Sequence, residues 1–592
     1  MRKDQMKYLT MLLVGLMVAP VHALAQAVDR MTPSEVVPKQ APQIVPRGQV
    51  GLPGRTPREA AGEKPYVPDQ PTLKLNGVII VKNKEEVVLD GVPDVTGIVI
   101  KGIPFIDTPD FRKMVTTRHL GHPLTENTIR DLEDDIIMYC RDRGNLLVDV
   151  VLLEQTIPPS GTIQLWFVQG KIGKVTIDNP GRKWFRDSLF SGELHLRPGT
   201  PLDSQQLTKD LDWLNTNPFR QVDAKFKLGE KLGTTDIQIN VNDRIPFRPY
   251  VGYENSGTTN TGVNRVLGGF NWGNAFGLDH QLNYQFATDI QYEHVWAHSA
   301  SYIVPLPWRH NILVYGSYVD AVIDTGATGG GTTAHGTSWQ TSIRYSLPLF
   351  DIRQYRHELA LGFDFKRANN NVLFGGTITQ PSDVDVAQFA AGYTGLLPDN
   401  WGKTSLGLEF YYSPGDLTEN NNDTAFNTLR HDSKSEYFYF RGNAERLTRL
   451  PYNFSYVLRG WAQWSNERLQ PSEELALGGY STIRGYNERV HLGDKGFIIN
   501  NEIRTPSFPL RLFALQDQIQ FLAFFDYGWA TADDIQPSDG NADRTLYSVG
   551  VGARYSVSHN FNLRFDYGIP LHDRDINGTQ FSRVDLGAIL SF

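Results

Sequence analysis

The sequence has little of what several common protein classes require. Its 592 residues include one cysteine, Cys140, so no internal disulfide can form, which argues against a disulfide-stapled secreted domain. The net charge of −8 gives no electrostatic reason to expect nucleic acid as a partner. After residue 25 there is no charge-free apolar run of about 20 residues, the length that a membrane-spanning helix needs. A barrel is then the remaining way to cross a membrane, and its strands need apolar residues only at every second position.

Motifs for catalysis and for metal binding are also missing. The chain contains no G-x-S-x-G elbow, no H-E-x-x-H pair and no Walker loop. His294 and His298 lie four residues apart, which is a helical pairing in a segment that reads as a strand. Cys140 has neither a second thiol nor a histidine near it, so it reads as a core residue. We expect no enzymatic activity, no metal and no cofactor.

The N-terminus has the pattern of an export signal. Arg2, Lys3 and Lys7 supply positive charge, and the run from residue 8 to 21 is mostly apolar. Ala23-Leu24-Ala25 offers small residues for cleavage, with residues 25–27 as an alternative site. A permanent N-terminal anchor is the competing interpretation, but the apolar run is short for a span. We therefore predict a signal peptide over residues 1–25.

A proline-rich segment follows the signal. Nine prolines fall between residues 33 and 71. Proline removes backbone donors and blocks continuous helix, so residues 26–73 are expected to form an extended or disordered tether.

Residues 74–245 predict two small α+β modules, 74–170 and 171–245. In the first, Thr125 can cap a helix that ends at Gly144. Two strands then follow, Leu146–Leu153 and Thr162–Val168. The second module repeats the order strand, helix, helix, strand, strand. Its expected elements are a strand over Gly173–Asp178, a short helix over Trp184–Phe190, a helix capped by Asp203, and strands over Val222–Leu228 and Thr235–Val241.

Residues 246–592 change to strict alternation of apolar and polar residues. In the segment Phe521–Trp529 the odd-numbered residues are apolar or aromatic, so Phe524 and Asp526 share the other face. A soluble β-sandwich also alternates, but many segments here reach the roughly 9–11 residues that cross a bilayer obliquely. Charged residues occupy the face that would line a wet lumen. We count sixteen such segments, and an even count is typical of a bacterial barrel.

One glycine-punctuated stretch lies between the candidate strands at 452–465 and 495–504. It reads Leu477-Gly478-Gly479-Tyr480-Ser481-Thr482-Ile483-Arg484-Gly485-Tyr486. An aspartate on the inner face of a barrel needs a partner, and an arginine on an infolded loop is suited to that role. The sequence thus points to Arg484 and Asp526 as a candidate pair.

The chain resembles the transporters of two-partner secretion, the ShlB/FhaC/HecB class, over roughly residues 75–592. Their L-G-G…[VI]-R-G-Y loop is matched by Leu477, Gly478, Gly479, Ile483, Arg484, Gly485 and Tyr486. Their F-x-D strand is matched by Phe524 and Asp526. A third pattern, from the second of their periplasmic POTRA domains, is matched by Pro201, Leu202, Leu207, Leu214, Asn215 and Pro218. Each motif alone is weak, whereas all three in this order are specific.

The resemblance implies two POTRA domains in the periplasm and a sixteen-stranded barrel in the outer membrane. It also implies that the sixth extracellular loop folds into the pore, with Arg484 paired to Asp526. In that family the POTRA domains capture a large unfolded exoprotein (an adhesin, haemolysin or toxin), which crosses the barrel without ATP. Expected partners are this exoprotein, outer-membrane lipid and the barrel-assembly machinery, whose signal the terminal aromatic residue Phe592 resembles. The proline density of residues 28–73 disfavours the amphipathic helix with which several members plug the pore.

Three other functions compete with this interpretation. A POTRA-bearing barrel that assembles outer-membrane proteins usually has three or more POTRA domains, and residues 74–245 hold two comfortably. A passive porin needs no α+β modules before its barrel. A barrel hydrolase needs a catalytic set, and the sequence carries no motif for one.

Overall fold

The computed structural model describes residues 70–592, apart from positions 182, 232, 259–260, 325–332, 353, 370–382, 513–515, 537–538 and 579–580. These residues form two compact units, one that ends at Ile245 and one from Pro246 to Phe592. The predicted signal peptide and nearly all of the predicted tether lie outside the described residues. Among those described, no helix combines the length and the apolar character needed to span a membrane.

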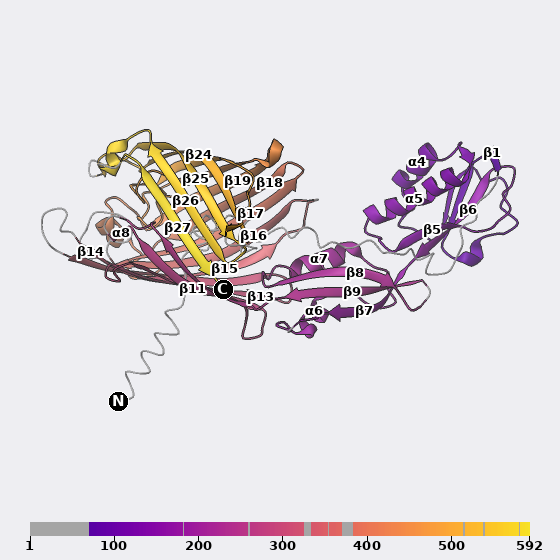
Figure 1. Ribbon diagram of the computed structural model, residues 1–592, viewed down its shortest axis with the longest axis horizontal. Helices are drawn as coiled ribbons and strands as arrows, with labels where there is room; N and C mark the ends of the chain where they lie inside the picture. The colour runs from indigo at the N-terminus through magenta and orange to yellow at the C-terminus, as the bar shows by residue number, and fades with distance from the viewer. Residues whose placement is uncertain are drawn as a thin grey trace, which may run out of the picture. The chain divides into compact units, whose positions relative to one another are not determined.

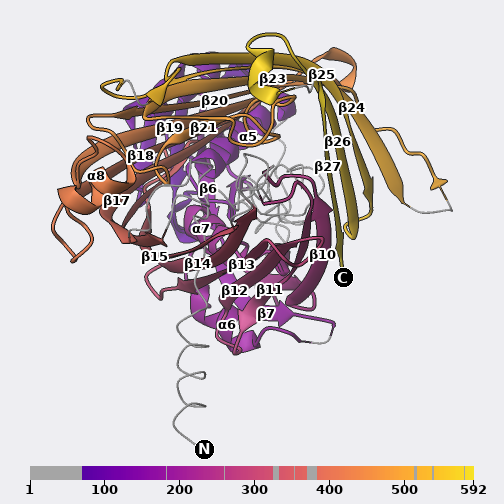
Figure 2. The ribbon, with the colours of Figure 1, turned by 90° about the vertical axis from the view of Figure 1, so that its left-hand side faces the viewer.

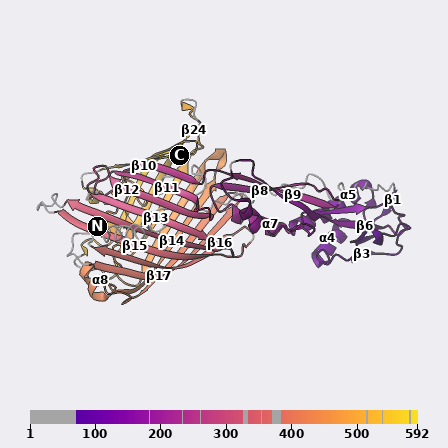
Figure 3. The same cartoon turned by 90° about the horizontal axis from the view of Figure 1, so that it is seen from below.

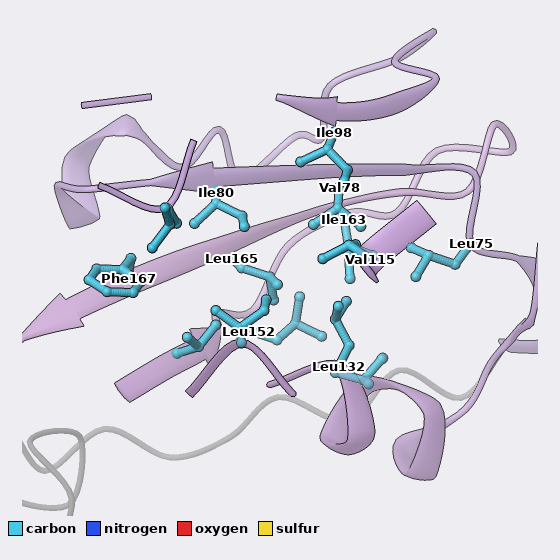
Figure 4. Close-up of a cluster of buried hydrophobic side chains, with 14 of the residues drawn as sticks. Leu75, Val78, Ile80, Ile98, Val115, Leu132, Leu152, Ile163, Leu165 and Phe167 are labelled. Atoms are coloured by element: carbon cyan, nitrogen blue, oxygen red, sulfur yellow. The ribbon is translucent and has the colours of Figure 1, made fainter. Parts of the chain in front are cut away.

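The first module of the N-terminal unit is built on a mixed four-stranded sheet of order β3-β2-β6-β5. Its elements are β1 (Gln70–Lys74), β2 (Gly77–Val81), β3 (Gly97–Lys101), α4 (Pro109–Arg118), β4 (Pro123–Leu124), α5 (Glu126–Asp142), β5 (Val148–Leu152) and β6 (Thr162–Gln169). Thr125 caps α5 through a capping box, as its position predicts. Apolar side chains of the sheet and of both helices form the core (Figure 4). Cys140 belongs to that core, and burial raises the pKa of its thiol to about 12.

The second module has a three-stranded sheet of order β7-β9-β8. Its elements are β7 (Lys171–Asp178), α6 (Asp187–Glu193), α7 (Ser204–Leu214), β8 (Arg220–Leu228) and β9 (Thr234–Asp243). Asp203 caps α7 by accepting hydrogen bonds from two backbone N–H groups. The prediction of a helix over Trp184–Phe190 was wrong by one turn. The N–H groups of Trp184 and Phe185 donate to Asp243 instead, so the helix begins only at Asp187.

The two modules share a junction. The carbonyl oxygen of Gly144, which follows α5, accepts hydrogen bonds from both the backbone N and the Oγ of Ser204 at the start of α7. Leu147 of the first module is buried in the apolar core of the second.

The C-terminal unit is a closed antiparallel barrel of sixteen strands, which confirms the predicted fold class and strand count. The strands, in order around the barrel, are β10 (Phe247–Glu254), β11 (Arg265–Ala275), β12 (His280–Asp289), β13 (Val295–Pro305), β14 (Asn311–Asp324), β15 (Thr333–Pro348), β16 (Arg356–Asn369), β17 (Asp383–Asp399), β18 (Gly402–Pro414), β19 (Glu436–Arg449), β20 (Ser455–Ser465), β23 (Lys495–Arg504), β24 (Asp517–Thr531), β25 (Arg544–Val557), β26 (Phe561–Pro570) and β27 (Arg583–Ser591). Neighbouring strands lie side by side and strongly tilted, β24 to β27 in Figure 1 and β10 to β14 in Figure 3.

The two faces of the barrel wall differ in the way the alternation predicts. On β24, Phe521 and Phe525 are exposed on the outside, while Phe524 and Asp526 are buried on the lumen side. The outside of the wall therefore suits lipid, and the inside carries the polar and charged residues.

Candidate functional site

Residues 466–494 connect β20 to β23 and dock against the lumen side of the barrel wall; we call this segment the pore loop. Within it, β21 (Leu475–Leu477) pairs with β22 (His491–Gly493) to form a short hairpin. Both hairpin strands lie against β24. The stretch Leu477–Tyr486 thus forms most of the turn of this hairpin.

Arg484 lies near the tip of the pore loop and reaches Asp526 on β24. Its Nε and Nη2 donate to the two carboxylate oxygens of Asp526 at 2.7 and 2.8 Å. The backbone N of Arg484 donates to the same carboxylate at 3.1 Å. Both side chains are almost completely buried, with 4% and 0% of their surface exposed. This is a bidentate, charge-assisted contact, the strongest kind of side-chain pairing in proteins.

Neighbouring side chains of the barrel wall contact the Arg484 guanidinium group on its remaining sides. Nη1 of Arg484 donates to Glu502 on β23 at 2.8 Å. The guanidinium lies over the ring of Phe524 at 3.6 Å from the ring centre, so both residues of the F-x-D pattern touch it. Asn500 donates to Asp526 at 2.7 Å and to the backbone carbonyl of Thr482 in the loop at 2.6 Å. The arginine is therefore fixed in position and orientation.

Two glycines let the loop backbone touch the wall. Gly485 has φ +94°, which favours glycine. A Cβ atom on Gly568 of β26 would lie 2.5 Å from the backbone nitrogen of Gly485. Neither position can accept a side chain without moving the loop away from the wall.

Apolar residues of the motif complete the docking. Leu477, Ile483 and Tyr486 are fully buried and pack against Ile498 and Leu546 of the wall. The hydroxyl of Tyr486 donates to the backbone carbonyls of Tyr547 and His572.

Gly478 and Gly479 shape the hairpin itself, since both have φ +95°. A Cβ on Gly479 would collide with the carboxylate of Glu488, whose Oε1 accepts the backbone N–H of Tyr480 at 3.0 Å. The structure thus brings together the loop motif residues and the two residues of the F-x-D pattern, while Leu202, Leu207 and Leu214 of the third pattern lie in the core of the second module. Phe592 belongs to neither group. That residue follows β27, is 67% exposed, and donates its N–H to the carbonyl of Pro249 in β10.

A second anchor at the base of the pore loop was missed by the sequence reasoning. The carboxylate of Glu473, 0% exposed, accepts hydrogen bonds from Lys366 on β16 at 2.7 Å, from Tyr439 on β19 at 2.6 Å and from Gln388 on β17 at 3.1 Å. Its backbone carbonyl accepts from Arg441 at 2.7 Å. The polarity is the reverse of that at the tip: here the loop supplies the anion and the wall supplies the cation.

The end of the pore loop is tied to the loop between β18 and β19. Arg430 follows α8 (Asp423–Leu429) and forms a bidentate pair with Asp494 at 2.6 and 2.9 Å. Phe426 and Leu429 of α8 pack with Leu469 of the pore loop in a buried apolar cluster.

The arrangement is suited to holding a loop in place. In the described part of the chain, no three histidine, cysteine, aspartate or glutamate residues are grouped so that they could hold a metal ion.

Comparison with known proteins agrees with this fold. Residues 233–555 match the family described as haemolysin secretion/activation protein ShlB/FhaC/HecB. The chain is 23% identical over 421 residues to the outer membrane transporter CdiB of Dickeya dadantii, which covers 70% of this chain and 72% of that relative. It is 20% identical over 498 residues to the heme/hemopexin transporter protein HuxB of Haemophilus influenzae strain 86-028NP, with coverages of 81% and 83%. The solved structure of CdiB from Escherichia coli has the same fold, with a TM-score of 0.68, 17% identity, and coverage of 90% of this chain and 95% of that one.

Proposed function

The chain belongs to the ShlB/FhaC/HecB family of haemolysin secretion/activation proteins, and on this premise we propose how it carries out export. It is an outer-membrane transporter of two-partner secretion, with its barrel in the membrane and its POTRA modules in the periplasm. The modules capture one large unfolded exoprotein, and the barrel passes it to the cell surface without ATP and without catalysis. The observation that carries the mechanism is the buried contact between Arg484 and Asp526.

That contact positions the pore loop for transport and is not needed to close the barrel. Strand hydrogen bonds close the barrel independently of the loop. Breaking a buried ion pair by removing one partner costs about 3–5 kcal/mol, against roughly 0–1 kcal/mol for an exposed pair. The loss therefore falls on loop docking, whereas the strand ladders stay intact.

Substitutions at the pair test this role. Arg484→Ala and Asp526→Ala should each abolish or sharply reduce export while the amount of assembled barrel stays near normal. Arg484→Lys should also fail, because lysine cannot make the bidentate contact. The double variant should be little worse than either single change, since both remove one interaction.

The matched control is Arg446→Ala, which removes a more exposed arginine–aspartate pair at the turn between β17 and β18. It should export normally. A pair of cysteines at positions 484 and 526 should cross-link in the assembled barrel. Fully additive losses, or a loop that reagents label only from outside the cell, would contradict the proposed role.

The second part of the proposal concerns capture. In the second module the sheet order β7-β9-β8 leaves β7 and β8 as edges, and an extended segment of the exoprotein can add to such an edge as a further strand. A soluble piece spanning residues 74–245 should bind the N-terminal region of the exoprotein. Binding that maps only to the barrel would overturn this assignment.

We propose that the barrel-assembly machinery recognises Phe592 and that insertion of the barrel into outer-membrane lipid depends on this recognition. Deleting Phe592 should lower the amount of heat-modifiable barrel, and unchanged assembly would count against this signal.

The exoprotein can be identified by comparing cells that contain this chain with cells that lack it. The cells without the chain should lose one large polypeptide from the medium or the cell surface, as measured by mass spectrometry. A general loss of outer-membrane proteins would favour the alternative function, assembly of other barrels.

A further inference from the structure

The lumen of the barrel has two chemically different walls. Gln388 and Lys366 face the lumen, because both contact Glu473 of the pore loop. Strand register then identifies the lumen positions on the neighbouring strands. Lys366 is paired with Gln340, and the row continues through Ser317, Ser299 and Gln285 on β14, β13 and β12.

The adjacent row runs from Gln388 through Asp364 and Ser342 to the buried Tyr315 on β14, and then reaches Ser301 on β13 and Asn283 on β12. We call the five lumen residues of these two rows that surround the buried Tyr315 on β12 to β14 the neutral wall: Asn283, Gln285, Ser299, Ser301 and Ser317. These five side chains are uncharged, and each is partly exposed.

The wall beneath the pore loop differs from the neutral wall in charge and in exposure. Its lumen positions include Arg441, Glu502, Asp526 and Asp566, and the three acids are buried. The hydrogen bonds and ion pairs described above join the loop to strands from β16 to β25.

The two walls face each other across the barrel. In the closed order of sixteen strands, β12 is eight places from β20 and β13 is eight places from β23. These are the two strands that the pore loop connects. Figure 2 shows β12, β13 and β14 on one side of the barrel, and β19, β20 and β23 on the opposite side.

The chemistry of the neutral wall fits a surface along which a chain moves. Short hydroxyl and amide side chains can exchange hydrogen bonds with water for bonds to any backbone, with a small net change in free energy. Fixed charges would hold segments of opposite charge and repel segments of like charge. A neutral and partly hydrated surface does neither, so it accepts a sequence of any composition.

We infer that the exported polypeptide passes in extended form along the neutral wall, opposite the docked pore loop. The inference rests on the proposed export function and adds to it the side of the lumen that is used. The pore loop and the wall beneath it then restrict the remaining space in the lumen without binding the exported polypeptide.

Photo-cross-linking in cells tests the path. The full chain carries p-benzoylphenylalanine at position 317 of the neutral wall or, as a matched control, at position 443 on β19. Asn443 also faces the lumen, since it is two residues from Arg441 on the same strand. Position 317 should cross-link, severalfold more strongly than 443, to the polypeptide that disappears when the chain is absent. Equal products at both positions, or more at 443, would overturn the inference.

A second measurement needs no exoprotein. The purified full chain carries Ser317→Cys or Asn443→Cys in a planar bilayer, and a bulky thiol-reactive cation is added. The native Cys140 is fully buried, so it stays silent. The current should fall severalfold more for Ser317→Cys, and a larger fall for Asn443→Cys would contradict the inference.

Charge insertion completes the test. Ser317→Asp should reduce export severalfold, whereas Ser317→Thr and Asn443→Asp should not, at equal levels of heat-modifiable barrel. Normal export by Ser317→Asp would also overturn the inference. Failure of the proposed function has a different signature: no polypeptide is lost from the medium in cells without the chain, whatever the bilayer currents show.

Discussion

The strands of the two units place charged and apolar side chains differently. In the N-terminal unit, Phe167 and Leu132 are buried in an apolar core. In the barrel, Arg484 and Asp526 are buried, whereas Phe525 is 41% exposed on the outside. Strands of both units show the same two-residue alternation. Alternation therefore shows that a strand has two unlike faces, and only the charges on one face show that the lumen is polar and the outside apolar.

Truncation in the apolar core should give the largest loss of stability. Phe167→Ala should lower the free energy of unfolding of the soluble 74–245 piece by about 3–5 kcal/mol, because it removes a buried ring that packs against Phe105. Denaturant unfolding measures this loss. The control, Met138→Ala, changes a side chain of the same module that is 53% exposed. Similar losses for both variants would mean that this module is not held by its apolar core.

A charge on the outer face of the barrel should have the next largest effect. Phe525 lies near the middle of β24, so Phe525→Arg should destabilise the barrel by about 2–4 kcal/mol in lipid. Urea unfolding in vesicles measures it, with Phe525→Leu as the control. No loss would mean that this face does not contact lipid and would break the comparison between the two units.

Loss of a helix cap should have the smallest effect. Asp203→Ala removes the acceptor for two N–H groups at the start of α7 and should cost about 1 kcal/mol in the 74–245 piece. Asp203→Ser should restore most of the stability, because serine is also a good cap. A loss that serine does not restore would show that the negative charge, and not the cap, is what matters.

The fold could be predicted because its signals are local. Period-two alternation predicts the sixteen strands, and strand parity alone places Phe524 and Asp526 on the lumen side. Thr125 and Asp203 are capping residues next to apolar helix patterns, and the structure has helices that begin there.

The details of the loop site could be predicted only in part. Arg484 could be matched to Asp526 because the motif resemblance connected two distant segments. Glu473 has no such motif, and its carboxylate is held by side chains from β16, β17 and β19. Such contacts depend on the register between strands. A slip of one residue turns every side chain to the other face of the sheet, and the alternation within one strand does not set its register with distant strands. The contact between Gly485 and Gly568 could not be predicted from the sequence for the same reason.

The junction at Gly144 gives the N-terminal unit a mechanical property. Under the proposed function, a polypeptide held on one module would pull on that module as it moves. The tension passes to the other module through the hydrogen bonds from Ser204 to the Gly144 carbonyl and through Leu147, instead of being absorbed by slack chain. The two modules are therefore coupled at this junction, so a load on one would be shared by the other.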